Sequence, residues 1–301
     1  MSKRTLAFLA AIVATTIYAL NHTIAKGVMP HYIRGFGFIL LRVAGAATLF
    51  WLFAFLGPRQ RIQKKDWLRL LVCSFFGMVI NMLSFFKGLE YSTPVNSAIL
   101  TTVTPIIVAF FSYLLIQEKL TKFKILGIIL GFSGAVTLIL MNEQTGLNAP
   151  NIPLGNALFV LNATCYGIYL ILVKELTTTY HPFVLMRWLF TLAVFMNLPV
   201  ALPEFVAVRW SEVPIEGILA MVFVVVGTTF TTYLFNAFAL TQLKASSISA
   251  FVYAQPLIGI AYAVITGHDR FKLLDLVAAV LVFTGVYLAT RRPKQGIAAS
   301  S

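Results

Sequence analysis

The feature that most constrains this chain is the recurrence of apolar segments, each about 20 residues long, along nearly its whole length. A helix needs about 20 apolar residues to cross the hydrocarbon core of a bilayer. Hydrophobic residues make up 59% of the sequence and charged residues 11%, whereas soluble domains carry roughly 25% charged residues. The sequence therefore predicts an integral membrane protein and excludes an ordinary soluble domain.

Ten such segments predict an all-α protein with ten transmembrane helices: 6–25, 33–56, 68–89, 94–116, 125–141, 154–173, 182–202, 215–240, 246–266 and 273–290. The first segment follows Lys3 and Arg4, so it could be a cleaved signal peptide or a signal anchor that stays as the first helix. The further spans, and the lack of a convincing small-residue cleavage site, favour the anchor.

The distribution of basic residues predicts the orientation in the membrane. With an even number of spans both termini share a side, and that side receives Lys3, Arg4, Arg59, Arg61, Lys64, Lys65, Arg69, Lys119, Lys122, Lys124, Lys174, Lys244, Arg291, Arg292 and Lys294. The opposite side receives Lys26, Arg34, Lys87, Arg209, Arg270 and Lys272. The positive-inside rule then places both termini in the cytoplasm, and we expect a bacterial inner membrane. The net charge of +13 indicates topology rather than nucleic-acid binding, because no loop is long enough to form a binding domain.

Two predicted spans hold a proline in their interior, in "ILTTVTPIIVAF" and "FVYAQPLIGIAY". Pro105 and Pro256 are 151 residues apart, and the same offset pairs "EKL" at 118–120 with "DRF" at 269–271. Such matches can also arise by chance between apolar segments. A proline inside a membrane helix frees a carbonyl, which hydroxyls, water or neighbouring helices must satisfy. The two prolines therefore predict helix kinks, kept either for a binding region or only for packing.

Earlier in the chain the offset is slightly smaller, and the matched pairs are Tyr18 with Tyr166, Lys26 with Lys174, and Arg42 with Arg187. Each half is predicted to hold five helices. Because five is odd, the second half enters the membrane from the opposite side, as in the inverted repeats of secondary transporters. The expected divisions are a first repeat at 1–145, a second at 150–292 and a cytoplasmic tail at 293–301.

These features resemble the EamA-type branch of the drug/metabolite transporter superfamily. The resemblance rests on 89–138 and 240–288, where each segment has small residues, a proline-containing helix, an acidic residue in a short turn and a closing helix with glycine. It implies a ten-helix carrier with a central cavity between its halves, and many such carriers export amino acids or other small metabolites. His268 and Asp269 depart from the usual glycine–glutamate or glutamine–glutamate pair, which says nothing about the substrate.

Polar side chains within spans should face the bundle interior or a wet cavity, because exposing them to lipid is costly. The predicted cavity residues are Tyr18, Asn21, His22, Asn81, Ser84, Lys87, Thr102, Asn162, Tyr166, Tyr169, Thr232, Tyr233, Asn236, Tyr253 and Gln255.

Each of these also has a structural interpretation. Serine and threonine often bond a carbonyl one turn back, and tyrosines near span ends can anchor the interface. Lys87 can extend to the outer surface, and His22 can pair with a neighbouring hydroxyl instead of contacting a solute or a proton. For Arg42 and Arg187 we favour a structural role against the backbone or helix ends.

The acidic residues fall in loops or near span ends, so we expect no transport step through a buried carboxylate, and His22 is the mid-span candidate for proton coupling. Cys73 and Cys165 lie within spans and indicate neither a disulfide framework nor a metal site. We expect no cofactor and no metal.

The predicted function is a secondary transporter that exports small neutral or zwitterionic solutes such as amino acids. One alternative is a carrier of organic anions or phosphorylated metabolites, for which only Lys87 offers a cation. A lipid scramblase is a second alternative. An intramembrane enzyme is the least expected, because the sequence lacks a nucleophile elbow, a zinc-binding histidine pair and a phosphate loop. The expected partners are a small solute and the lipid bilayer, without nucleic acid, for a monomer or a homodimer.

Overall fold

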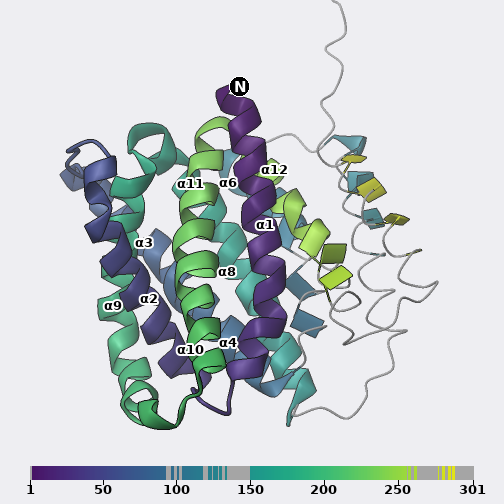
Figure 1. Cartoon of the computed structure of the whole chain (residues 1–301). Coiled ribbons are helices and arrows are strands. Elements are labelled where there is room, and N and C mark those ends of the chain that lie inside the picture. The colour runs from purple at the N-terminus through teal and green to yellow at the C-terminus, as the bar shows by residue number, and fades with distance from the viewer. Residues whose placement is uncertain are drawn as a thin grey trace, which may run out of the picture.

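The structure is a computed structural model of the chain and is a bundle of helices (Figure 1). It describes residues 2–92, 96–97, 100–101, 104–117, 121–123, 125–127, 129–130, 133, 150–255, 257–258, 261–262, 277, 280–281, 284–285 and 287–288. Within these residues every regular element is a helix. The predicted all-α class is therefore confirmed for the described part of the chain.

The first half begins with α1 (Lys3–Val28) and α2 (Gly35–Leu52). Its third span is continuous through α3 (Trp67–Ser74), the π-helical segment η3 (Phe75–Ile80) and α4 (Asn81–Tyr91). The short 3-10 turns η1 (Ala54–Leu56) and η2 (Lys64–Asp66) lie between α2 and α3. The helix α6 (Thr104–Ile116) follows.

The second half repeats this order. It begins with α8 (Ile152–Thr179) and α9 (Pro182–Val206), and the 3-10 turn η5 (Trp210–Glu212) follows. The next span runs through α10 (Ile215–Val222), the π-helical segment η6 (Phe223–Thr231) and α11 (Thr232–Gln242). Two short elements, α12 (Ala245–Ala250) and the 3-10 helix η7 (Phe251–Ala254), come after it.

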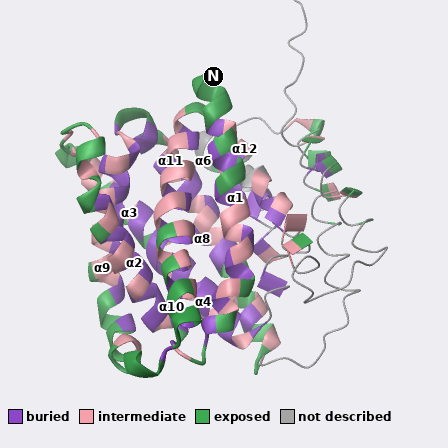
Figure 2. Cartoon of the chain, in the orientation of Figure 1, coloured by how far each residue is buried: buried purple, intermediate pink, exposed green. Residues whose placement is uncertain are grey.

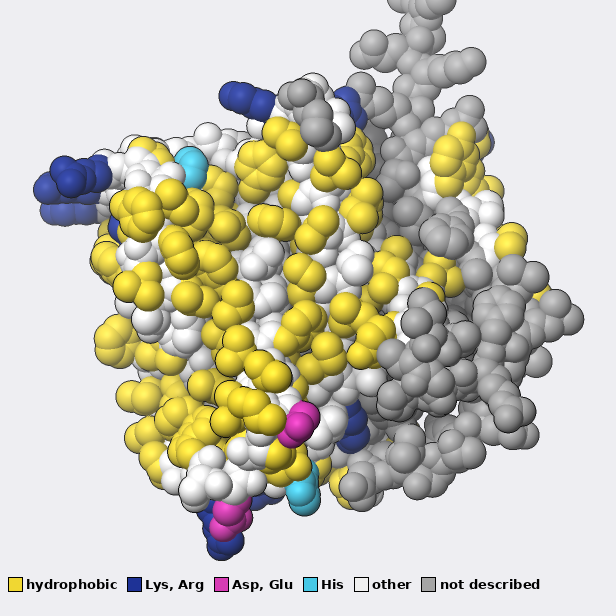
Figure 3. All heavy atoms as spheres, in the orientation of Figure 1, with side chains coloured by type: hydrophobic (Ala, Val, Ile, Leu, Met, Phe, Trp, Pro, Cys, Tyr) yellow, Lys and Arg dark blue, Asp and Glu magenta, His cyan; other side chains and the backbone are white. Residues whose placement is uncertain are grey.

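Six helices among the described residues are long and apolar enough to cross a membrane. They correspond to the first three predicted spans of each half. The other four predicted spans fall wholly or partly outside the described residues, so the number of ten remains a prediction. Figure 3 shows apolar side chains over the middle of the visible face, with charged side chains gathered toward its two ends, as a surrounding bilayer requires.

The helices α1 and α8, which begin the two halves, run in opposite directions. In the loop after α2, Gln60 Nε2 donates to the carbonyl of Thr179 at 2.8 Å, so α8 ends at the face of the bundle where α1 begins (Figure 1). At the other face, Ser92 Oγ just after α4 donates to Asn156 Oδ1 near the start of α8, at 2.8 Å. This antiparallel relation is the one expected when two halves enter the membrane from opposite sides.

Two lysines occupy equivalent positions at opposite ends of the bundle. Lys26 Nζ donates to the carbonyl of Leu89 at 2.5 Å, in the last turn of α4. Lys174 Nζ donates to the carbonyl of Leu240, in the last turn of α11. A lysine is favourable there because the last carbonyls of a helix lack intrahelical donors. The two contacts are equivalent, because Lys26 is matched with Lys174 and Leu89 lies 151 residues before Leu240, at the offset of the prolines.

The core lies between the two halves. The helix α2 packs along α9, α4 along α8, and α1 along α11, so each half buries its helices against the other. Phe38, Phe50, Phe86 and Phe190 are each 0% exposed in this core. Figure 2 shows the buried residues concentrated on the facing sides of these helices.

The segments η3 and η6 occupy matching positions and each ends immediately before a polar residue, Asn81 or Thr232. These two residues are 151 residues apart, which is the offset of the prolines. A π-helix leaves carbonyls without their usual i+4 partners, and such segments are common at functional sites. Here Tyr233 Oη donates to the carbonyl of Gly77 at 3.2 Å, and Thr229 Oγ1 donates to that of Val224 at 2.8 Å.

Pro105 is the second residue of α6, which is described from Thr104 onward. Thr101 is in a 3-10 conformation, and residues 102–103, which lie between it and α6, are outside the described residues. The kink at Pro105 therefore stays a prediction. Pro256 lies outside the described residues, and so does Thr102.

Candidate functional site

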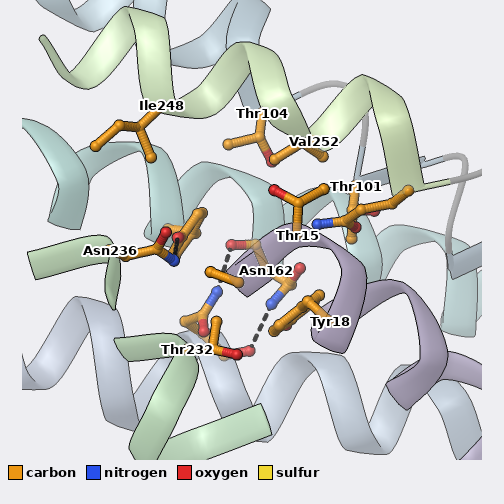
Figure 4. Close-up of a pocket in the computed structure, with 13 residues that line it drawn as sticks. Thr15, Tyr18, Thr101, Thr104, Asn162, Thr232, Asn236, Ile248 and Val252 are labelled. Atoms are coloured by element: carbon orange, nitrogen blue, oxygen red, sulfur yellow. Dashed lines mark hydrogen bonds between the residues drawn. The ribbon is translucent and has the colours of Figure 1, made fainter. Parts of the chain in front are cut away.

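A cavity of about 40 Å³ lies between the two halves (Figure 4). This volume holds a few water molecules and is well below the usual range of about 300–1,000 Å³ for small-molecule sites, so the cavity is narrow in this conformation. Its described lining comes from both halves: Ala14, Thr15, Tyr18, Asn81, Thr101, Thr104, Asn162, Tyr166, Thr232, Asn236, Ile248, Val252 and Gln255. Among these residues the polar groups are hydroxyls and amides, with no carboxylate, amine, guanidinium or imidazole.

Seven predicted residues meet in this cavity: Tyr18, Asn81, Asn162, Tyr166, Thr232, Asn236 and Gln255. The lining also includes Thr15, Thr101 and Thr104, which were not among the predicted cavity residues. Thr15 precedes Tyr18 by three residues, so helical spacing alone places both on one face of α1. That spacing was the signal that could have identified it.

Asn81 and Asn162 form a reciprocal pair across the two halves (Figure 4). Asn81 Nδ2 donates to the carbonyl of Asn162 at 3.0 Å, and Asn162 Nδ2 donates to the carbonyl of Asn81 at 2.9 Å. Both side chains are buried, at 3% exposure. The pair ties α4, directly after the π-helical segment η3, to the middle of α8 and leaves both amide oxygens free to accept from a solute.

The matched tyrosines have different neighbours. Tyr166 Oη accepts from Asn236 Nδ2 at 3.3 Å. Tyr18 instead packs against Phe85, with the ring centroids 6.1 Å apart, and Phe85 is 151 residues before Asn236. In the second half the phenol of Tyr166 is therefore paired with an amide. In the first half the equivalent phenol, that of Tyr18, lies beside an apolar ring.

His22 lies behind the cavity wall and is buried, at 3% exposure. Its Nε2 is 3.5 Å from Gln255 Oε1, and its Nδ1 is 2.7 Å from Ser97 Oγ. Because an amide oxygen only accepts, Nε2 carries a proton and donates to Gln255 Oε1, whereas the serine hydroxyl can either donate to Nδ1 or accept from it. His22 thus contacts Gln255, one of the lining residues.

Other predicted residues are buried near the cavity without lining it. The rings of Tyr169 and Tyr233 pack at a tilt with their centroids 6.2 Å apart, and Ser84 is buried within α4. Asn21 is 0% exposed, and both its side-chain polar atoms lack a hydrogen-bond partner in the described part of the chain. The side chain of Tyr253 lies outside the described residues.

Lys87 lies elsewhere, and its partners are side chains rather than a solute site. Its Nζ is 2.6 Å from Glu90 Oε2 and 4.0 Å from Glu204 Oε1, and it lies over the rings of Phe36 and Tyr91. Both acids cap the start of α2: Glu90 accepts from Gly35 N, and Glu204 accepts from Phe36 N at 2.8 Å. The sequence interpretation of these acids as span-end residues missed this capping role, which depends on contacts distant in sequence.

The matched arginines also differ. Arg42 is 1% exposed and lies at the centre of α2, where Nε donates to Thr229 Oγ1 at 2.8 Å. Arg187 is partly exposed near the start of α9 and lies over the rings of Trp51 and Trp188, with 4.5 Å from its Cζ to the Trp51 centroid. The side-chain partners of Arg42 replace the backbone and helix-end contacts that the sequence suggested.

Metal ligands do not converge in the described residues, where no group of three His, Cys, Asp or Glu side chains could hold an ion. Cys73 and Cys165 are free and buried.

Two halves of opposite direction with a polar cavity between them are an arrangement typical of membrane transporters. A model of the EamA-like transporter family matches the chain twice, over residues 5–140 and 153–291. The chain therefore belongs to the EamA-like transporter family, a part of the drug/metabolite transporter superfamily, and is a membrane transporter.

Similar proteins support this assignment. An uncharacterized transporter of Archaeoglobus fulgidus is 23% identical over 90% of this chain and 91% of its own length. The uncharacterized transporter YyaM of Bacillus subtilis is 25% identical over 82% of this chain and 81% of its own. A solved crystal structure superposes with a TM-score of 0.75 at 17% identity, covering 94% of this chain and 96% of that one, which shows a shared fold.

Proposed function

We propose that this transporter exports small neutral or zwitterionic solutes, such as amino acids, through the cavity between its halves. The observation that carries the proposal is the cavity lining, in which hydroxyl and amide groups from both halves converge in a buried space. Hydroxyls and amides can donate and accept hydrogen bonds without demanding a net charge on the ligand. The cavity of about 40 Å³ is smaller than an amino acid, so the proposal requires a conformation in which the cavity widens.

Alternating access around this cavity is the proposed mechanism. In inverted-repeat carriers, groups of helices from the two halves rock around a site near the middle of the membrane. The matched lysine contacts at the ends of α4 and α11 support this, because each fixes one end of the cavity-lining helices at an opposite face of the bundle. Each contact would have to break when its own face opens.

The proposed orientation follows the basic residues and places both termini in the cytoplasm of a bacterial inner membrane. Export then means movement from the face that carries the amino terminus of α1 to the face that carries the loop between α9 and α10 (Figure 1).

The test is solute flux in proteoliposomes. Purified protein would be reconstituted, and uptake of radiolabelled amino acids, nucleobases and sugar phosphates measured with and without a proton gradient. We expect flux of one or more amino acids. Asn162→Leu removes a lining amide and is expected to lower that flux at least about tenfold, whereas Phe195→Leu, on the exposed face of α9, should leave it unchanged. Movement of lipid without any soluble solute would instead establish a scramblase.

Proton coupling is tested at His22, the titratable ring next to the cavity. His22→Gln keeps a donor and an acceptor near Gln255 but cannot bind a proton at neutral pH. If His22 couples transport to protons, the variant retains solute exchange at equal pH and loses the response to a pH gradient. An unchanged response to the gradient would contradict a coupling role for His22.

A further inference from the structure

The arginine at the centre of α2 is the least expected charge in the bundle. Arg42 is the largest side chain with under 2% exposure, and it lies midway along a membrane-spanning helix. A guanidinium remains charged in proteins, and a charge inside a membrane is retained only with compensating partners. Among the described residues, no carboxylate lies within 4.0 Å of Arg42.

The contacts of Arg42 hold its guanidinium in a fixed orientation without neutralising it. Nε donates to Thr229 Oγ1 at 2.8 Å, and that hydroxyl in turn donates to the carbonyl of Val224 in η6. Its Cζ lies 4.6 Å from the ring centroid of Phe86. The two terminal nitrogens, Nη1 and Nη2, form no hydrogen bond with the described part of the chain. They are the fork that binds carboxylates in a bidentate manner.

Packed aromatic rings connect Arg42 to the cavity lining. Arg42 lies over the ring of Phe86, whose centroid is 5.1 Å from that of Phe85. Phe85 packs against Tyr18, which lines the cavity, with the ring centroids 6.1 Å apart (Figure 4). The hydroxyl of Tyr18 has no hydrogen-bond partner among the described residues, and Tyr233 donates its own proton to Gly77. Tyr18 is therefore a lining residue whose hydroxyl is available to a solute.

We propose that Arg42 is the anion-recognition residue of the transport site and that the transported solute carries a carboxylate group. This inference rests on the proposed function and specifies its substrate class. The carboxylate accepts from both terminal nitrogens of Arg42, and Tyr18 donates its free hydroxyl to one of the same oxygens. The amides and hydroxyls of the cavity then bind the rest of the solute.

The other candidate cations are already occupied or lie elsewhere. Lys87 is paired with Glu90 at 2.6 Å, and Lys26 donates to the carbonyls of Leu89 and Ser92. Arg187, which corresponds to Arg42 in the second half, lies against Trp51, which is 46% exposed. Arg187 therefore provides a matched control, with the same side chain in the equivalent helix but away from the cavity.

The experiment compares each common amino acid with its primary amide, which lacks the carboxylate. Two measurements are made on the full-length protein: thermal unfolding in detergent with each compound at equal chloride concentration, and flux in proteoliposomes. The variants are Arg42→Met, Arg42→Lys, Tyr18→Phe and the control Arg187→Met. Methionine is chosen because replacing an uncompensated buried charge with an apolar side chain of similar volume commonly preserves or raises stability.

We expect wild-type protein to bind and transport one or more amino acids at least about tenfold better than the corresponding amides, as a charge-assisted bidentate contact predicts. Arg42→Met should fold with unchanged or higher thermal stability and lose this preference. Arg42→Lys, with a point charge in place of the fork, should retain only part of it. Tyr18→Phe should weaken binding less than Arg42→Met does, and Arg187→Met should retain the full preference.

The two measurements separate the two proposals. Equal binding of acids and amides by the wild type, or an unchanged preference in Arg42→Met, would overturn the role of Arg42 while leaving transport intact. Arg42-dependent binding of carboxylates without flux would overturn the transport function and leave the recognition site. If the Arg42→Met protein unfolds at a lower temperature and loses binding of amino acids and of their amides equally, Arg42 has a structural role and the inference is wrong.

Discussion

At the scale of single residues, the cavity depends on which group donates and which accepts. Asn81 and Asn162 each donate to a backbone carbonyl of the opposite half, whereas Asn236 donates to a phenol. A backbone carbonyl can only accept, but a phenol can reverse its role and donate. We therefore expect an aspartate to be tolerated in place of Asn236 but not in place of Asn81.

Replacing each amide by a carboxyl group tests this difference. Asn81→Asp places a carboxylate against the carbonyl of Asn162, so we expect flux at pH 7.5 to fall at least about tenfold and stability to fall by about 1–3 kcal/mol. Below the pKa of the new carboxyl group, its O–H can donate, and part of the flux should return. Asn236→Asp is the control, because Tyr166 can donate to the new carboxylate.

Flux and thermal unfolding measured at pH 5 and pH 7.5 provide the readout. An Asn81→Asp protein as active at pH 7.5 as the Asn236→Asp protein would show that the bond between the halves is not needed.

Sequence reasoning identified much of the cavity, because polar side chains inside a membrane protein must avoid lipid. Tyr18, Asn162 and Tyr166 follow from that rule alone. It did not reveal the contacts of Lys87, whose partner Glu90 is only three residues away but whose neighbours Glu204 and Phe36 come from distant helices. It could not rank Arg42 above Arg187, because burial depends on helix packing and not on position within a span.

At the scale of elements, the two π-helical segments shape the cavity. Each wider turn contains an additional residue and frees carbonyls, and in η3 these accept from Tyr233 and from Asn197 Nδ2, at 3.3 Å from the carbonyl of Met78. The side chains that complete these bonds come from α11 and α9 of the other half. The π-helical segments therefore help to join the halves where the cavity lies.

Deleting one residue distinguishes a π-helical turn from an α-helical one. Removing Phe75, whose side chain is 41% exposed, should return η3 to regular α-helix with the flanking helices still in register. We expect a folded, monodisperse protein that has lost most of its flux. Removing Phe195 from α9 rotates every later residue of that helix by about 100° and should prevent folding.

Size-exclusion chromatography and flux measure the two effects. Equal loss of folded protein in both deletions would contradict a distinct role for the π-helical turn.

The sequence predicted the long helices within a few residues, because continuous apolar runs mark membrane spans strongly. For example, the predicted span 215–240 corresponds to the continuous helix from Ile215 in α10 to Gln242 in α11. It did not predict η3 and η6, since their apolar side chains are the same as those of an α-helix.

At the scale of the whole molecule, the asymmetry of basic residues predicts which face is cytoplasmic. Cys73 and Cys165 are buried, so cysteines introduced on exposed loops can be labelled selectively. With a membrane-impermeant maleimide on intact cells, we expect labelling of Ala207→Cys, after α9, and none of Gln63→Cys, before α3. Both should react once the cells are permeabilised. The reverse pattern in intact cells would show that the protein has the opposite orientation, and the direction of export through the bundle would then be reversed as well.

The matching positions of the two π-helical segments also bear on the history of the protein. If the halves arose by duplication, one early irregular turn accounts for both segments, whereas separate origins would require the same change at the same place twice. The wide turn would then be older than the two-halved chain. A single ancestral half, paired with an oppositely inserted copy of itself, would already have enclosed a cavity, and differences such as that between Arg42 and Arg187 would be later specialisation.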